Sequence, residues 1–178
     1  MIKLRSEDLY SHSIQVAKIA RILCHEVQNK YDDDVYIAAL LHDLGKIAVR
    51  DSVLLKPGQL TKKEWEQMKM HTVWGYEILR KFDAPMRVAN AVLYHHENAD
   101  GTGYFGLKDS EIPLEAKILR VADVFSAMTS NRVYKAAYPV DYVVSHCAKL
   151  FPGINIMNIK DILTEELNID KKVLLTCK

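Results

Sequence analysis

Hydrophobic residues recur along much of this chain with the spacing of an α-helix. In residues 8–28 one helical face carries His12 and, from one turn later, a row of apolar residues: Val16, Ile19, Ala20, Leu23 and Val27. The same spacing predicts helices from Asp32–Asp34 to near Gly45, at 61–82, from Pro85 to His95 and His96, from Pro113 through Asp123, and at 139–150 and 155–167. No segment shows the convincing alternation of a β-strand. We therefore expect an all-α fold, a single-domain helical bundle spanning residues 1–178.

Several predicted helix ends carry the residues that such ends favour. Thr61 and Glu64 form the T-x-x-E pattern of a capping box. Pro85 suits the first turn of a helix, and Gly45 suits a C-terminal cap. These residues support the predicted boundaries.

Composition and charge exclude several classes of protein. The chain has 178 residues, 49% of them hydrophobic and 26% charged, with a formal net charge of +1. Such a balance gives no basic field for DNA or for an anionic membrane. No apolar run approaches the roughly 18 residues of a membrane span. The three cysteines are odd in number and lack metal-site spacing, so we expect a reduced, cytoplasmic protein that binds neither DNA nor a membrane.

Histidines and acids in five separated segments form the main candidate site. They are His12, His42, Asp43, His71, His95, His96 and Asp123. Imidazole and carboxylate groups hold Zn, Fe or Mn in hydrolytic sites. A lone histidine on an apolar helix face is ordinarily a hydrogen-bonded core residue, and by that reasoning His25 and His146 receive no role. Five such residues in one small core would be costly to bury, whereas one polynuclear metal site satisfies them together.

Asp123 is surrounded by apolar residues on its predicted helix, so its carboxylate is expected to be buried. The alternative to metal binding is an ion pair with Arg120 or Arg132.

A glycine-rich segment follows the paired histidines. HHENADGTGYFG at 95–106 holds three glycines within six residues, which excludes a helix and permits close backbone approach to a ligand. The alternative is an ordinary surface loop. Lys46 and Lys56 are ordinarily surface lysines, but a lysine beside a metal centre suits a phosphate anchor.

Five motifs occur in the order of a known family. They are HDLGK at 42–46, LLKPGQLTKKEW at 54–65, HTVWGYEIL at 71–79, HHENADGTGY at 95–104 and ILRVADVFSAMTSNRVY at 118–134. In this order the chain resembles the HD-GYP domains, a subgroup of the HD metal-dependent phosphohydrolases. The resemblance covers about residues 8–150, and residues 151–178 form a divergent, helical C-terminal tail.

The resemblance implies a bundle with two or three divalent metal ions that hydrolyses cyclic di-GMP to pGpG or GMP. His12, His42, Asp43 and Asp123 resemble the core HD ligands, with Asp43 bridging two ions. His71, His95 and His96 resemble the ligands of the second ion. Asp8 stands one helical turn before His12, where members with three metals carry a glutamate. Iron or manganese is expected, with zinc, nickel and cobalt as alternatives.

The resemblance also assigns residues to catalysis and substrate. Asp43 and Lys46 are expected to be catalytic, with Lys46 near the scissile phosphate. Tyr104, Arg132 and Lys135 are expected to contact the substrate, and Glu97 to orient a metal ligand. A metal-activated water then replaces a serine or cysteine nucleophile.

The chain departs from the family pattern at several positions. Phe105 replaces the proline of the GYP signature, and Ser126 stands where an aspartate is usual. Asn131 and Val133 replace the residues that usually flank Arg132. These changes bear on substrate fit and partner contacts more than on metal binding.

Two alternative functions therefore remain. One is a phosphohydrolase for another cyclic or linear nucleotide or dinucleotide. The other is a catalytically weak domain that binds a cyclic dinucleotide or a protein. A diguanylate cyclase or another signalling protein is a candidate partner, and a homodimer is a candidate assembly.

Overall fold

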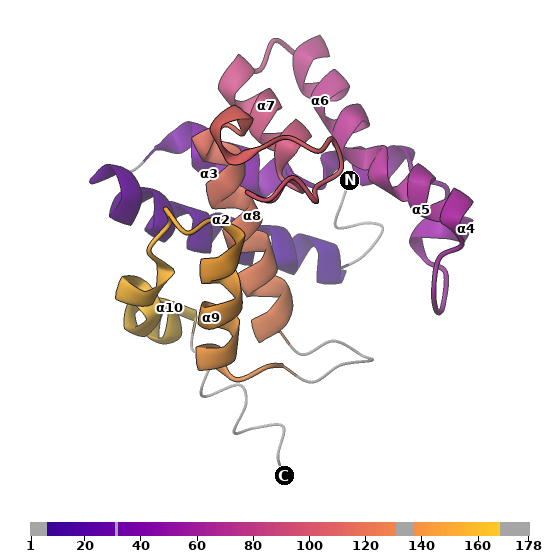
Figure 1. Ribbon diagram of the computed structural model, residues 1–178. Helices are drawn as coiled ribbons and strands as arrows, with labels where there is room; N and C mark the ends of the chain where they lie inside the picture. The colour runs from indigo at the N-terminus through magenta and orange to yellow at the C-terminus, as the bar shows by residue number, and fades with distance from the viewer. Residues whose placement is uncertain (1–6, 31, 131–136, 168–178) are drawn as a thin grey trace.

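The computed structural model describes residues 7–30, 32–130 and 137–167, and every regular element in that part of the chain is helical (Figure 1). The elements are α2 (Glu7–Gln28), α3 (Asp33–Leu41), η1 (Leu44–Ala48), α4 (Asp51–Leu54), α5 (Lys62–Lys69), α6 (His71–Lys81), α7 (Met86–Tyr94), η2 (Asp109–Glu111), α8 (Leu114–Thr129), α9 (Val140–Leu150), η3 (Ile156–Ile159) and α10 (Lys160–Leu167). The η elements are 3₁₀-helices. The expected all-α fold is confirmed.

The core lies among α2, α3, α7 and α8, which pack on one another. The apolar face predicted on α2 is confirmed, since Val16, Ile19, Ala20 and Leu23 are fully buried. Burial of such a face, more than helix propensity, stabilises a helix in a folded protein.

The C-terminal elements extend this core. Helix α9 packs on α8, and α10 contacts α2 and α9. Phe151, Ile154, Ile156 and Leu163 are all buried. Residues 151–167 therefore cover part of the bundle.

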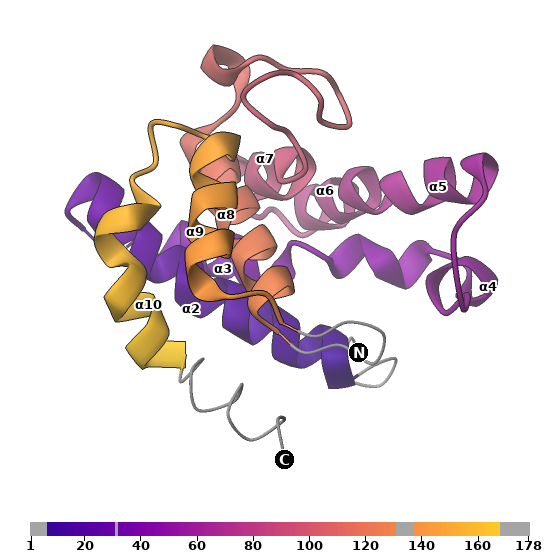
Figure 2. The same cartoon turned by 60° about the horizontal axis from the view of Figure 1, so that its bottom comes forward.

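Helices α4 and α5 form an arm, residues 51–69, that lies away from α9 and α10 in both views (Figures 1 and 2). None of the eight residues of α5 is buried. The predicted capping box is confirmed: Glu64 N–H donates to Thr61 Oγ1, and Thr61 N–H donates to the Glu64 carboxylate. Lys56 Nζ donates to the same carboxylate at 2.6 Å, which ties the turn before α5 to its first helical turn.

Two predicted boundaries differ in the structure. The helix expected over 61–82 is two helices, α5 and α6, that meet at Met70. Gly45 does not cap α3, which ends at Leu41; it lies inside η1. A Cβ atom on Gly45 would lie 1.9 Å from the carbonyl oxygen of His71 and 2.5 Å from the backbone nitrogen of Gly75. Glycine is needed here because η1 and α6 approach backbone to backbone.

Candidate metal centre

Three of the predicted ligand histidines share one local arrangement. His42, His71 and His95 each stand just after a helical segment and bond through Nδ1 to the carbonyl oxygen three residues earlier, at 2.7, 2.7 and 2.6 Å. A carbonyl oxygen only accepts, so Nδ1 carries the proton and donates it. The Nε2 atom of each neutral ring is left with a lone pair for a ligand. Carbonyl groups in the last turn of each helix thus orient the rings.

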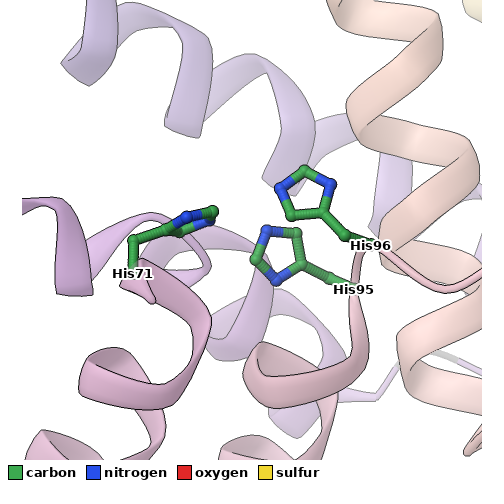
Figure 3. A group of neighbouring side chains, drawn as sticks. All are labelled: His71, His95 and His96. Carbon is green, nitrogen blue, oxygen red and sulfur yellow. The ribbon is translucent and has the colours of Figure 1, made fainter. Parts of the chain in front are cut away.

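His71, His95 and His96 form one potential ligand group, and Figure 3 shows the three side chains close together. One ligand atom from each lies within 4.8 Å of the others. The Nε2 atoms of His71 and His95 are buried and have no hydrogen-bond partner within the described residues. Leaving a polar atom in this state costs about 1–3 kcal/mol. Two such atoms in a cluster of neutral imidazoles fit a metal cation.

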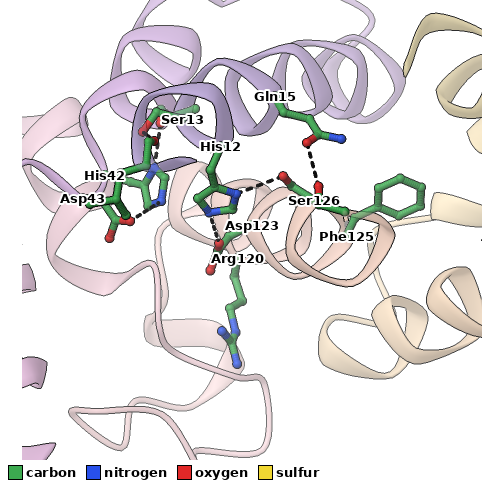
Figure 4. Close-up of polar contacts among 12 residues, drawn as sticks. His12, Ser13, Gln15, His42, Asp43, Arg120, Asp123, Phe125 and Ser126 are labelled. Atoms are coloured by element: carbon green, nitrogen blue, oxygen red, sulfur yellow. Dashed lines mark hydrogen bonds and ion pairs between the residues drawn. The ribbon is translucent and has the colours of Figure 1, made fainter. Parts of the chain in front are cut away.

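His12, His42 and Asp43 form a second group with ligand atoms within 4.8 Å of one another. His12 Nε2 lies 3.0 Å from Oδ1 of Asp123, and His12 Nδ1 lies 3.0 Å from Oγ of Ser126 (Figure 4). A serine hydroxyl can donate or accept, so Ser126 is compatible with a proton on either His12 nitrogen. An ionised aspartate at this position could only accept.

Asp123 therefore pairs with a histidine, and the alternative ion pair with Arg120 is wrong. Arg120 instead donates through Nε to Oδ1 of Asn98 at 3.0 Å. Its Nη1 lies 3.3 Å from Nδ1 of His96.

Asp43 lies between the two groups. Its Oδ2 accepts a hydrogen bond from Lys46 Nζ at 2.6 Å and lies 3.4 Å from Nε2 of His42. Its Oδ1 lies 3.5 Å from Nε2 of His71. The rings of His42 and His95 are 5.2 Å apart between centroids, so the two groups adjoin. From this position the Asp43 carboxylate could serve both groups.

Burial keeps most of the histidines neutral. It lowers the pKa of His71, lowers that of His95 well below the ordinary histidine value, and lowers that of His96 to about 3. His42 differs: burial would lower its pKa, but the neighbouring Asp43 carboxylate raises it overall. Neutral imidazole is the form that binds a metal.

The two carboxylates are held ionised. Burial would raise the pKa of Asp43, but Lys46 and His42 together lower it well below its ordinary value. For Asp123 the burial effect is likewise outweighed, by the hydrogen bond from His12 and by His42 and His96. The donor set thus combines three neutral imidazoles, those of His71, His95 and His96, with two ionised carboxylates.

Glu97 holds the glycine-rich loop. Its buried carboxylate accepts from the N–H of Phe105 at 2.9 Å and from the N–H of Leu107 at 2.8 Å. A Cβ on Gly103 would lie 2.4 Å from Oε1 of Glu97, so glycine permits this fold-back. Both hydrogen bonds go to the loop. The role predicted for Glu97 from the sequence, orienting a metal ligand, stays a prediction.

The loop places Tyr104 against the metal centre. Its ring lies 4.5 Å from that of His96 at an interplanar angle of 34°. Burial raises the pKa of Tyr104 to about 12, so its phenol stays protonated. Trp65 and Lys69 also contact Tyr104 and were given no role by sequence reasoning. The sequence feature that could have singled out Trp65 is its position inside one of the five ordered motifs, LLKPGQLTKKEW at 54–65.

The remaining predicted residues lie elsewhere or outside the described part. Arg132 and Lys135 are outside the described residues. Asp8 belongs to α2 one turn before His12, but its side chain is not described. Lys56 pairs with Glu64 in the arm.

The sequence matches the HD domain family over residues 9–128, more than half of the chain. The cyclic di-GMP phosphodiesterase of Thermotoga maritima is 40% identical over 142 residues, covering 77% of this chain and 39% of that protein. The response regulator RpfG of Xanthomonas campestris, a cyclic di-GMP phosphodiesterase, is 49% identical over 115 residues, covering 63% and 30%. The 3'3'-cGAMP-specific phosphodiesterase 3 of Vibrio cholerae is 35% identical over 144 residues, covering 79% and 31%. The matched part of this chain thus spans 30% to 39% of the length of these relatives.

Two solved structures share the fold. Bd1817, an HDG"Y"P protein from Bdellovibrio bacteriovorus, matches with a TM-score of 0.67 at 19% identity, covering 88% of this chain and 52% of that one. The HD domain of PgpH from L. monocytogenes, solved with cyclic-di-AMP, matches with a TM-score of 0.66 at 20% identity, covering 94% and 93%. Across the described ranges, no helix has the length and apolar character needed to cross a membrane.

The profile match and the relatives agree with the order of the five motifs and with the two ligand groups at the helix ends. The chain therefore belongs to the HD domain family, with the HD-GYP proteins as its relatives.

Proposed function

We propose that this protein is a metal-dependent phosphodiesterase that hydrolyses cyclic di-GMP to pGpG or GMP. The observation that carries the proposal is the pair of adjoining ligand groups, with two buried Nε2 atoms that have no partner among the described residues. The curated relatives, which include cyclic di-GMP phosphodiesterases, support the choice of substrate.

The ligand groups divide between two ions. His12, His42, Asp43 and Asp123 would hold one, and His71, His95 and His96 the other, with Asp43 shared. Two such ions, when bound, lower the pKa of a water molecule and neutralise phosphoryl charge. We propose iron or manganese, with zinc, nickel and cobalt as alternatives, and a third ion at Asp8.

The chain's own residues bind and orient the substrate. Lys46, whose side chain is 24% exposed, brings a positive charge to the edge of the buried Asp43 carboxylate. There it can bind a phosphate oxygen and hold a proton for the leaving oxygen. The protonated Tyr104 phenol can donate a hydrogen bond, and we assign phosphate contacts to Arg132 and Lys135.

The direct test is turnover by protein loaded anaerobically with Fe(II) or, separately, Mn(II), with products resolved by chromatography. We expect pGpG or GMP from the loaded protein. The Asp43→Ala variant should lose both bound metal, measured by mass spectrometry, and turnover. Full activity in that variant, or no product from protein shown to carry metal, would contradict the proposal.

Another dinucleotide is the second candidate substrate, because the curated relatives include phosphodiesterases specific for 3'3'-cGAMP and because Phe105 alters the signature loop. A panel of cyclic and linear dinucleotides separates these substrates by kcat/KM. A binding role without catalysis is less well supported, because the ligand set is nearly complete. A diguanylate cyclase or other signalling partner and a homodimer remain predictions.

A further inference from the structure

Trp65 is an exposed aromatic residue beside the metal centre. Trp65 is 44% exposed, although large aromatic side chains are usually well buried. It lies on α5, none of whose residues is buried, so it does not anchor the arm to the core. Its one ring contact in the described chain is with Tyr104, at 6.2 Å between centroids and an angle of 84°.

Tyr104 connects Trp65 to the ligand histidines. The Tyr104 ring is tilted against His96 at 4.5 Å and lies edge-on to His71 at 6.4 Å. Because Trp65 meets Tyr104 edge to face, Tyr104 leaves at least one flat face of the indole uncovered. Lys69 Nζ lies 5.8 Å from the centre of the Tyr104 ring, and it also pairs with Oε1 of the exposed Glu66 at 3.0 Å. A flat apolar surface, a phenol and a cation thus lie one ring away from the histidine cluster.

We propose that Trp65, Tyr104 and Lys69 form a base subsite that stacks a purine of the nucleotide substrate while its phosphate lies at the metal centre. This proposal rests on the proposed function and adds the group that recognises the base. Nucleobases stack on exposed aromatic rings, and proteins hold single-stranded nucleic acids by such stacking together with nearby positive charge. The position also suits a dinucleotide, in which base and phosphate are separated by one sugar.

The test uses pGpG, the product of the first cut of the proposed reaction, and chromatography of each sample after titration checks that the pGpG has remained intact. The chain has two tryptophans, Trp65 and Trp74, so the Trp74→Phe variant leaves Trp65 as the only indole. We expect pGpG to quench the fluorescence of that variant when it is loaded with Mn(II). Ribose 5-phosphate, which has no base, should leave the fluorescence unchanged.

Calorimetry then compares variants. Trp65→Ala should weaken pGpG binding about tenfold or more, the range expected for one stacked base, whereas Trp65→Phe should restore most of the affinity. Ribose 5-phosphate should bind wild type and Trp65→Ala equally. Phe82→Ala removes another exposed aromatic residue, 79% exposed at the end of α6, and should change nothing.

The outcomes separate this proposal from the proposed function. Equal pGpG affinity in wild type and Trp65→Ala, or no binding to metal-loaded protein, overturns the base subsite. Stacking of pGpG on Trp65 without hydrolysis of cyclic di-GMP would uphold the subsite and overturn the phosphodiesterase. Hydrolysis of cyclic di-GMP with the same KM in wild type and Trp65→Ala would uphold the phosphodiesterase and overturn the subsite.

Discussion

Phe105 supplies a backbone group that a proline at the same position lacks. Its N–H donates to Oε1 of Glu97, a carboxylate buried beneath the glycine-rich loop. Its ring also contacts Tyr94 edge-on, at 5.6 Å between centroids. The family proline would fix the backbone angle φ, whereas this chain fixes the loop with a hydrogen bond and an aromatic contact.

The Phe105→Pro variant should therefore be less stable, although it restores the family signature. Loss of one donor to a buried carboxylate costs about 1–3 kcal/mol in the free energy of unfolding, measured with urea. Phe105→Ala keeps the N–H, loses only the ring contact, and should cost less than about 1 kcal/mol. Equal stability of Phe105→Pro and wild type would show that the hydrogen bond is not what holds the loop.

The sequence predicted the candidate ligands that the structure brings together, but it did not predict how they pair. Histidines on apolar helix faces or at helix ends can be singled out in a sequence, because burying an imidazole is costly unless it has a hydrogen-bond partner or a metal. The contacts of His12 with Asp123 and Ser126 join residues more than 110 positions apart, so only the packing of α2 on α8 shows them. The hydrogen bonds that Glu97 accepts from the N–H groups of Phe105 and Leu107 were not predicted, because a backbone N–H partner has no signature in the sequence.

At the scale of elements, Gly45 sets how closely η1 approaches α6. These two elements carry Lys46 and His71, and Asp43 is the residue just before η1. The relative position of the two ligand groups therefore depends on a backbone contact that any side chain at position 45 would obstruct.

The Gly45→Ala variant should lose stability and metal together. A methyl group 1.9 Å from a backbone oxygen has to displace η1 or α6, which costs about 3 kcal/mol or more. Urea unfolding and metal content per chain measure the two effects. Gly153→Ala is the matched control, because nothing lies within 4 Å of its added methyl group. An active, fully loaded Gly45→Ala protein would refute the close approach.

The capping box of α5 should depend on pH through Glu64. Hydrogen bonds from Lys56 and Thr61 lower the pKa of Glu64 to about 2 from its ordinary value of 4.5. Because the folded pKa is the lower one, the stabilisation is complete above about pH 4.5 and is lost as pH falls towards 2. The stability difference between wild type and Glu64→Gln should shrink over that interval in urea unfolding. A constant difference would contradict the prediction.

Helix boundaries show where periodicity stops being informative. The capping box at Thr61 was predicted because it is a local pattern. The division at Met70 was not, because no glycine or proline marks it and Met70 keeps right-handed helical backbone angles. Helices η1 and α4 were also missed, since elements of four or five residues give too short a periodic pattern.

At the scale of the whole molecule, the metal centre lies where α2, η1, α6, α7 and α8 meet, and the apolar core packs beside it. The core residues of α2 and α8 bury one another's apolar side chains. We therefore expect the bundle to fold before the centre is loaded.

Removal of the metal should leave the helices formed and lower the melting temperature. After treatment with a chelator, circular dichroism should keep its helical signal. Adding Mn(II) at about 100 times its dissociation constant should return about 2.7 kcal/mol of stability. A His95→Ala variant should respond less to the metal. Loss of helical signal on chelation would show that the ions hold the fold together.

The short hydrogen bonds of His42, His71 and His95 bear on the timing of activation. Each ring is aligned by a carbonyl three residues away, so alignment is complete once the local helix has formed. We therefore expect metal to bind these three rings at a rate proportional to ion concentration, with no lag for refolding. The supply of metal could thus set the fraction of the folded protein that carries ions.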